Sequence, residues 1–281
     1  MELIKAIKKD EALVAEMEGF LPDAKHFYIW WLGQSGFLLQ WNGKRVLLDP
    51  YLSDSLTKKY RTTDKPHTRM SEQALSPELL KGISVVTSSH NHTDHLDAET
   101  LIPVLKNNPG IRFIIPEANR KFVADRMQCD HAFPVGMNDR QSVTIDGFTF
   151  HGLPAKHNEI DRDENGNCRY MGYVISFGGF NIYHSGDTLW FDEMVELLKP
   201  FHVDLALLPI NGNDPARKVA GNLDSKEAVE LAKAINAKML IPCHYDMFEF
   251  NTADVNDFKK IAEANGQPYK VLLGGEYYTN Q

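Results

Sequence analysis

A short polar stretch, residues 87–97, carries several side chains that bind divalent metals in proteins. These are His90, His92, Asp94 and His95, which fall within six residues. Imidazole suits zinc and other divalent transition metals, and a carboxylate adds negative charge to a site. A solvated loop with exposed histidines is the alternative interpretation, but so dense a set of potential ligands favours metal binding.

The residues before this stretch indicate how it is positioned. The apolar run at residues 83–86 is typical of a short buried strand. His90 and His92 would leave the carboxyl end of that strand pointing in one direction, because side chains two residues apart on a strand share a face. Asp94 and His95 would follow from the next turn. The four ligands can therefore divide into two pairs, as two neighbouring metal ions require.

The spacing His90-x-His92-x-Asp94-His95 resembles the HxHxDH motif of the metallo-β-lactamase superfamily. Residues 153–157, 180–188 and 238–246 resemble the later motifs of that family, in the family's order. The resemblance covers the chain from about Phe27 to Gly275. It implies an α/β fold, the αββα four-layer sandwich. We expect a single domain over residues 1–281 that begins with a docking helix at 1–20.

The resemblance also implies a ligand set for two divalent metal ions. One ion would be bound by His90, His92 and His157, the other by Asp94, His95 and His244, and both by Asp187. Gly186 would allow the tight turn that aims Asp187. His151 lies within the preceding strand and is expected to pack there. His184 is expected beside the ligands or facing the substrate, because the implied ligand set is already complete.

Two such ions can lower the pKa of a shared water and hold the resulting hydroxide as a nucleophile. We expect zinc or manganese, with iron as an alternative. Asp94 would also orient the hydroxide and carry its proton, and His184 is the second candidate catalytic residue. The default reaction is therefore hydrolysis.

Several segments resemble the group around ascorbate-6-phosphate lactonase: residues 30–33, 183–187, 204–215 and 236–246. This likeness implies a small, anionic ester or lactone as the substrate. A metal-dependent phosphodiesterase is the alternative, and a non-catalytic metal-binding protein is a third hypothesis. A di-iron protein that reduces oxygen or nitric oxide would usually have Glu in place of His92, and a flavin domain that does not fit this length.

Basic residues near the expected rim of the site are candidates for binding an anionic group. Arg61 and Arg69 lie in a long polar segment, residues 51–74, and Arg217 and Lys218 follow residues 211–215. Arginine pairs bidentately with phosphate or carboxylate. Solvated loop charges are the alternative interpretation. The segment 51–74 itself is expected either to cover the site or to be a solvated excursion.

Composition limits the partners. The net charge of −8 and the pI near 5.8 do not favour nucleic acid or an anionic membrane. We expect a cytoplasmic protein with a small-molecule substrate, because the sequence shows no signal peptide and no apolar run of spanning length. Cys129, Cys168 and Cys243 are expected to be reduced. A homo-oligomer is compatible with these features.

Local patterns predict the remaining elements. An amphipathic helix is expected at residues 2–18, and strands at 27–32, 36–40 and 44–50, with a hairpin at Asn42-Gly43. Later elements are a helix at 98–106 capped by Asp97, a strand at 111–115, a helix at 117–127 and a hairpin at 142–151. Asp49 is expected to be either a hydrogen-bond acceptor beside the ligands or a turn cap.

Overall fold

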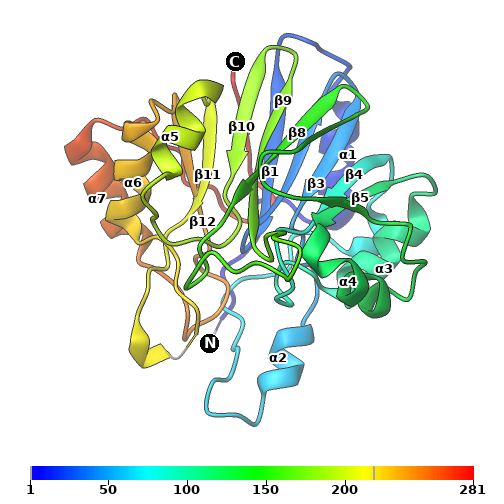
Figure 1. The fold of residues 1–281 in the computed structure, drawn as a ribbon, viewed down its shortest axis with the longest axis horizontal. Coiled ribbons are helices and arrows are strands. Elements are labelled where there is room, and N and C mark those ends of the chain that lie inside the picture. The colour runs from blue at the N-terminus through cyan, green and yellow to red at the C-terminus, as the bar shows by residue number, and fades with distance from the viewer. Residues whose placement is uncertain (1, 218) are drawn as a thin grey trace.

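Two β-sheets packed face to face form the centre of the protein, and helices cover their outer faces (Figure 1). The computed structural model describes residues 2–217 and 219–281. One sheet has the strand order β13-β1-β2-β3-β4-β5-β6 and the other β12-β11-β10-β9-β8-β7. The helices α1, α3 and α4 lie outside the first sheet, and α5, α6 and α7 lie outside the second. The predicted αββα arrangement is thereby confirmed.

The element bounds follow the sequence patterns closely. The first sheet contains β1 Phe27–Gly33, β2 Gly36–Trp41, β3 Lys44–Leu48, β4 Ile83–Thr87, β5 Arg112–Pro116, β6 Val135–Met137 and β13 Tyr277–Thr279. The second contains β7 Ser142–Ile145, β8 Phe148–Pro154, β9 Met171–Phe177, β10 Phe180–His184, β11 Leu205–Pro209 and β12 Met239–Cys243. The helices are α1 Asp10–Gly19, α2 Ser55–Tyr60, α3 Ala98–Asn107, α4 Arg120–Met127, α5 Met194–Leu198, α6 Ser225–Ala234 and α7 Val255–Asn265.

The main core lies between the two sheets. Inward-facing side chains such as Ile29 of β1, Phe150 of β8 and Ile175 of β9 belong to one buried cluster. A second cluster joins the outer face of the first sheet to α1, α3 and α4 through residues such as Leu13 and Leu101. The sheets therefore bury both of their faces, which explains why β1, β9 and β11 are apolar almost throughout.

The predicted turns adopt the backbone conformations that their residue types favour. Asn42 and Gly43 take positive φ values of 47° and 74°, as a two-residue hairpin between twisted strands requires. Asp146 and Gly147 do the same, with φ of 54° and 89°. The side chain of Asp97 accepts a hydrogen bond from the backbone N–H of Thr100 and begins α3 as predicted.

The predicted N-terminal helix is wrong over its first half. The helix α1 begins at Asp10, because the backbone of the preceding residues is used elsewhere: Ile4 pairs with Ser71, and the N–H of Ile7 donates to the carbonyl of Gly274. Leu3 and Ile7 are exposed instead of forming a buried stripe. Only Leu13 and Met17 are buried, so the docking helix is shorter than residues 1–20.

The segment 51–74 is not wholly irregular, since it contains α2, whose Leu56 is buried. This helix extends from the lower edge of the body in Figure 1. Hydrogen bonds from Met70 to Met247 and from Glu249 to Thr68 join the segment to the chain that follows β12. Among the described residues, the helices lack the combination of length and apolar character needed to cross a bilayer.

Strand direction determines where the candidate ligands meet. The strands β3, β4, β5 and β6 run parallel, as do β10, β11 and β12. The segments that follow β4, β8, β10 and β12 carry the predicted ligands. Polar side chains from both sheets are therefore delivered to one edge of the sandwich, where α/β enzymes commonly place their sites.

Gly186 allows the turn that carries Asp187 to pack closely against a second ligand segment. It has φ 58°, and a Cβ atom there would lie 2.6 Å from the Cβ of Ser89 and 2.8 Å from the carbonyl oxygen of Met171. The turn carrying Asp187 thus packs directly against the segment that carries His90, at a distance only glycine allows.

We predict that Gly186→Ala destabilises the protein by about 2–5 kcal/mol, the sum of left-handed strain and overpacking. Gly266→Ala is the matched control, because Gly266 has φ 63° but a Cβ atom there would meet no atom of the described residues within 4 Å. It should lose only about 1–2 kcal/mol. Chemical denaturation measures both variants, and equal losses would contradict the role of close packing at Gly186.

Candidate metal centre

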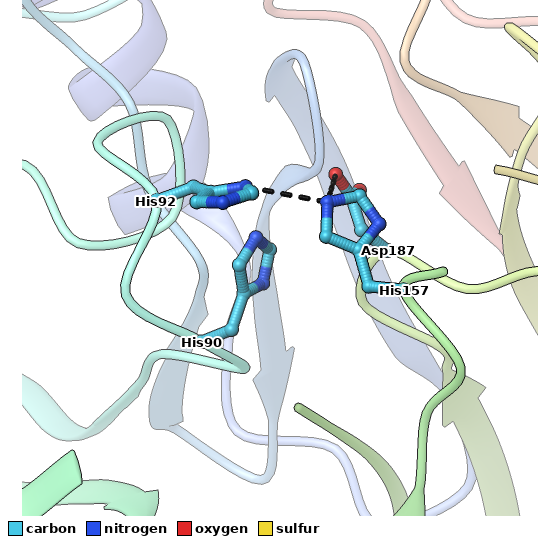
Figure 2. A group of neighbouring side chains, drawn as sticks. All are labelled: His90, His92, His157 and Asp187. Carbon is cyan, nitrogen blue, oxygen red and sulfur yellow. Dashed lines mark hydrogen bonds and ion pairs between the residues drawn. The ribbon is translucent and has the colours of Figure 1, made fainter. Parts of the chain in front are cut away.

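The structure brings the seven predicted ligands together at one edge of the sandwich. Figure 2 shows four of them, His90, His92, His157 and Asp187. One group of donors consists of His90, His92, His157 and Asp187, and the other of Asp94, His95, Asp187 and His244. Within each group the donor atoms lie within 4.8 Å of one another. Asp187 belongs to both groups. The described residues therefore offer two neighbouring places for a cation.

The distances between donor atoms match those around a single ion. Donors bonded tetrahedrally at zinc distances lie about 3.3 Å apart. In the first group, His157 Nε2 lies 3.3 Å from His92 Nδ1, and both rings turn towards the same point in Figure 2. In the second group, the distance from His95 Nε2 to Asp187 Oδ1 is 3.2 Å and that from His244 Nε2 to Asp187 Oδ2 is 3.4 Å.

Several donors are buried without a hydrogen-bond partner in the described part of the chain. They are His90 Nε2, His95 Nε2 and Asp187 Oδ1. A buried polar atom left unpaired typically costs about 1–3 kcal/mol, so native proteins rarely tolerate several together. A cation in the first group would satisfy His90 Nε2, and one in the second would satisfy His95 Nε2 and Asp187 Oδ1. The residues present therefore fit a metal centre.

Hydrogen bonds determine which ring nitrogen is available as a ligand. His157 Nδ1 lies 3.1 Å from the carbonyl oxygen of Gly221, and His95 Nδ1 lies 2.7 Å from Asp49 Oδ2. Since a carbonyl or carboxylate oxygen can only accept, both Nδ1 atoms carry hydrogen. The Nε2 atoms keep their lone pairs for a cation, as is usual for metal-bound histidine.

Asp49 is a hydrogen-bond acceptor beside the ligands, which decides between its two predicted roles. Besides His95, it accepts from the hydroxyl of Thr87 and from the backbone N–H and hydroxyl of Ser89. Burial opposes its ionisation, but the hydrogen bond from His95 and the nearby His184 hold the pKa of Asp49 below its ordinary value. The carboxylate thus holds the His95 ring in one orientation.

The pKa values of the histidines differ between the two groups. Burial, followed by the neighbouring His95 and His92, holds the pKa of His90 well below its usual range, and burial lowers the pKa of His157 to about 4. Burial also acts against the charge of His244, but Asp187 and Asp94 outweigh it and raise its pKa to about 9. A cation near Asp94 and Asp187 would displace the proton of His244, so metal binding should release protons.

Gln34 is a residue of this site that the sequence did not reveal. It is 1% exposed, and its Nε2 donates to Asp94 Oδ2 at 2.9 Å. Its carbonyl accepts from the N–H of His244 and from Trp31 Nε1. The residue therefore positions a ligand from each of two loops. Its place beside Gly33 in the turn after β1 was the only available signal, and it does not distinguish a site residue from a turn residue.

A cavity of about 570 Å³ opens beside the two groups of donors. Its wall includes Asp94, His157, Asp187 and His244, together with residues of the segment 51–74 and of the chain after β12. The basic side chains in the wall are Lys59, Lys65 and Arg126. The aromatic ones are Tyr60, His67, Phe122, Phe248 and Phe250.

The predicted arginines are not part of this wall. Arg61 is exposed, and Arg69 donates to Ser53 and Asp54 within its own segment. Arg217 donates to the side chain of Asn251 and the carbonyl of Asn211. The contacts of Arg69 and Arg217 join loops around the cavity. Lys218 lies outside the described residues.

Two further histidines lie away from the cavity wall. His184 is buried and donates from Nε2 to the carbonyl of Ser35 at 2.9 Å, so it is placed next to the ligand segment and does not face the cavity. His151 packs its ring against Phe201 at 5.0 Å. Cys243 is buried, and burial raises the pKa of its thiol, as expected of an inert cysteine.

Residues 28–244 match the family model described as the Beta-lactamase superfamily domain. The chain belongs to this superfamily. Relatives named UPF0173 metal-dependent hydrolase include one from Archaeoglobus fulgidus, 30% identical over 89% of this chain and 97% of the relative. Another, from Methanosarcina mazei, is 29% identical over 87% of this chain and 94% of the relative. The chain is thus a metal-dependent hydrolase of the metallo-β-lactamase superfamily.

Solved structures of other proteins share this fold. A metallo hydrolase from Ignicoccus hospitalis has a TM-score of 0.66 and 23% identity, covering 91% of this chain and 99% of that one. An isothiocyanate hydrolase from Delia radicum gut bacteria has a TM-score of 0.71 and 18% identity, covering 89% and 98%. At these identities the likeness concerns the fold alone.

The two histidines near β8 provide a test of the ligand assignment. We predict that His157→Ala lowers metal affinity by more than the 10–100-fold typical of a residue that only supports a ligand. His151→Ala should keep the metal content of the unmodified protein, because its ring packs on Phe201. Elemental analysis after dialysis against zinc or manganese measures both. Equal metal loss in the two variants would contradict the assignment.

Proposed function

We propose that this protein uses two divalent cations to hydrolyse a small, anionic ester or lactone. The observation that carries the proposal is that two groups of donors share Asp187 beside one cavity. We propose zinc or manganese as the metal, and iron as an alternative, because a nitrogen-rich site with carboxylates accepts all three. When bound, two such ions lower the pKa of a water and polarise the bond that is cleaved.

The side chains at the site would bind the cations and orient the attacking water. His90, His92 and His157 would hold one cation, and Asp94, His95 and His244 the other, with Asp187 shared by the two groups. Asp94 lines the cavity with one oxygen held by Gln34, so it is suited to orient the attacking water. His184 donates from Nε2 to the carbonyl of Ser35, so a catalytic role for it would have to act through the neighbouring ligand residues.

The cavity supports a small substrate with an anionic group. Its volume of about 570 Å³ is in the range of small-molecule sites. Lys59 and Arg126 bring positive charge to the cavity wall. A cyclic ester of the kind implied by the lactonase-like motifs fits this combination. A phosphodiester fits the charge as well, so a metal-dependent phosphodiesterase is the second candidate.

We also propose a cytoplasmic location, in keeping with the unpaired cysteines.

Removing the shared ligand should abolish the reaction. We predict that Asp187→Ala lowers kcat/KM by at least about 1,000-fold, since it disturbs both cation sites at once, and that it reduces the bound metal. Asp192→Ala, an exposed carboxylate outside the cavity, is the control. The assay uses glucono-δ-lactone, its 6-phosphate and bis(p-nitrophenyl) phosphate with added zinc or manganese. Metal content and activity unchanged in Asp187→Ala would refute the shared site.

The positive charge in the wall should determine the preference for an anionic substrate. We predict that Lys59→Ala raises KM for the 6-phosphate lactone by about 10-fold or more, as expected for a lost charge-assisted hydrogen bond, and leaves KM for the neutral lactone unchanged. Arg61→Ala is the matched control, because it removes the same charge two residues away, outside the cavity wall. An equal effect of both variants would attribute the preference to net charge alone.

A further inference from the structure

His67 is a histidine of the cavity wall that belongs to neither group of metal donors. It lies in the segment 51–74, which also lines the cavity with Lys59 and Tyr60. The same wall contains Asp94, His157 and Asp187. His67 is therefore a titratable side chain that shares the space of the substrate without being needed to hold a cation.

The ring of His67 is held on several sides. It stacks on Tyr60 with 4.4 Å between the ring centroids and an angle of 22° between the planes. Phe250 and Phe248 pack against it at 4.5 Å and 5.0 Å. The hydroxyl of Thr57 donates to the carbonyl of His67 at 2.7 Å and fixes the backbone. These contacts hold the ring in one orientation at the cavity wall.

The hydrogen bonds of the ring determine which nitrogen can react. Nδ1 lies 2.9 Å from the carbonyl oxygen of Lys65, which can only accept, so Nδ1 carries a hydrogen. No hydrogen bond joins Nε2 to any residue in the described part of the chain. Nε2 is therefore the atom that can give or take a proton. An imidazole oriented through Nδ1 and reactive through Nε2 is the usual arrangement in acid–base catalysis.

The surrounding charges are compatible with proton donation. Burial, together with the charges of Lys59 and Lys65, lowers the pKa of His67, while the Lys65 carbonyl and Asp94 act in the opposite direction. A lower pKa makes the imidazolium a stronger acid. An anionic substrate bound beside Lys59 would in turn favour the protonated ring.

We propose that His67 is the catalytic residue that donates a proton from Nε2 to the leaving group of the substrate, a role that rests on the proposed hydrolase function. As the carbon–oxygen bond of the ester breaks, its electron pair stays on the leaving oxygen, which takes the proton from Nε2. The neutral ring keeps its Nδ1 hydrogen bond to Lys65. The carboxylic acid product then ionises, and the proton that it releases restores the protonated ring.

The test compares two esters that differ in the basicity of the leaving group. p-Nitrophenyl acetate releases a weakly basic phenolate that needs little protonation, whereas phenyl acetate releases a more basic one. His67→Gln should lower kcat/KM for phenyl acetate by about 100-fold or more, the usual contribution of a general acid, and for p-nitrophenyl acetate by less than about 10-fold. His67→Phe keeps an aromatic ring between Tyr60 and Phe250 and should show the same discrimination.

The controls separate this role from a structural one. His151→Gln removes a histidine outside the cavity and should change neither ester, and both His67 variants should keep the metal content and unfolding midpoint of the unmodified protein. Equal losses for the two esters, or no loss, would overturn the role of His67 and leave the hydrolase function standing. If the unmodified protein, loaded with zinc or manganese, cleaves neither ester nor any of the lactones, the proposed ester and lactone hydrolysis fails and the role of His67 with it.

Discussion

The carboxylate of Asp187 is buried, and a buried charge is tolerated only among groups that compensate it. An isolated ion in the interior costs several kcal/mol even after the surroundings relax. In this protein His95, His157 and His244 lie within 4 Å of its oxygens. Three separate segments of the chain must therefore reach one point. The position of the two sheets, with β4, β8 and β12 ending at the same edge, meets that requirement.

The histidine ligands also need hydrogen-bond acceptors that hold their rings in place. A histidine can present Nε2 to a cation only if Nδ1 has an acceptor. Asp49 supplies one for His95 and is itself held by Thr87 and Ser89. The carbonyl of Gly221 supplies one for His157. These two ligands are thus each fixed by a neighbour from another loop, which couples the end of β3 to the segment after β4 and the loop after β11 to the segment after β8.

The cavity wall has a different origin from the donor groups. The segment 51–74 and the chain after β12 meet in a small cluster of Tyr51, Leu56, Met247 and Phe248, apart from the main cores. Such peripheral segments can vary without disturbing the sheets, and function often resides in them. Their aromatic and basic side chains face the same space as the metal donors. We therefore propose that these segments select the substrate and that the sandwich positions the metal donors.

The sequence by itself determined the strands, the hairpins and the first four candidate donors, because each depends on local rules; His157, Asp187 and His244 came from the resemblance to the superfamily. Alternation and apolar runs indicate strands, Asn42-Gly43 favours one hairpin, and closely spaced histidines after a buried strand indicate metal ligands. The N-terminal helix was predicted too long because a non-local backbone pairing, Ile4 with Ser71, competes with helix formation. Local propensity contains no information about such a partner.

Only the tertiary structure decided which polar residues reach the substrate cavity. Arg61, Arg69 and Arg217 lie close to the site in the sequence, yet their side chains point to solvent or to loop partners. Gln34, Lys59 and His67 line the cavity although nothing in their sequence context identifies them. The physical reason is that the direction of a loop side chain depends on long-range packing, here between the segment 51–74 and the chain after β12. Local sequence patterns do not encode that contact.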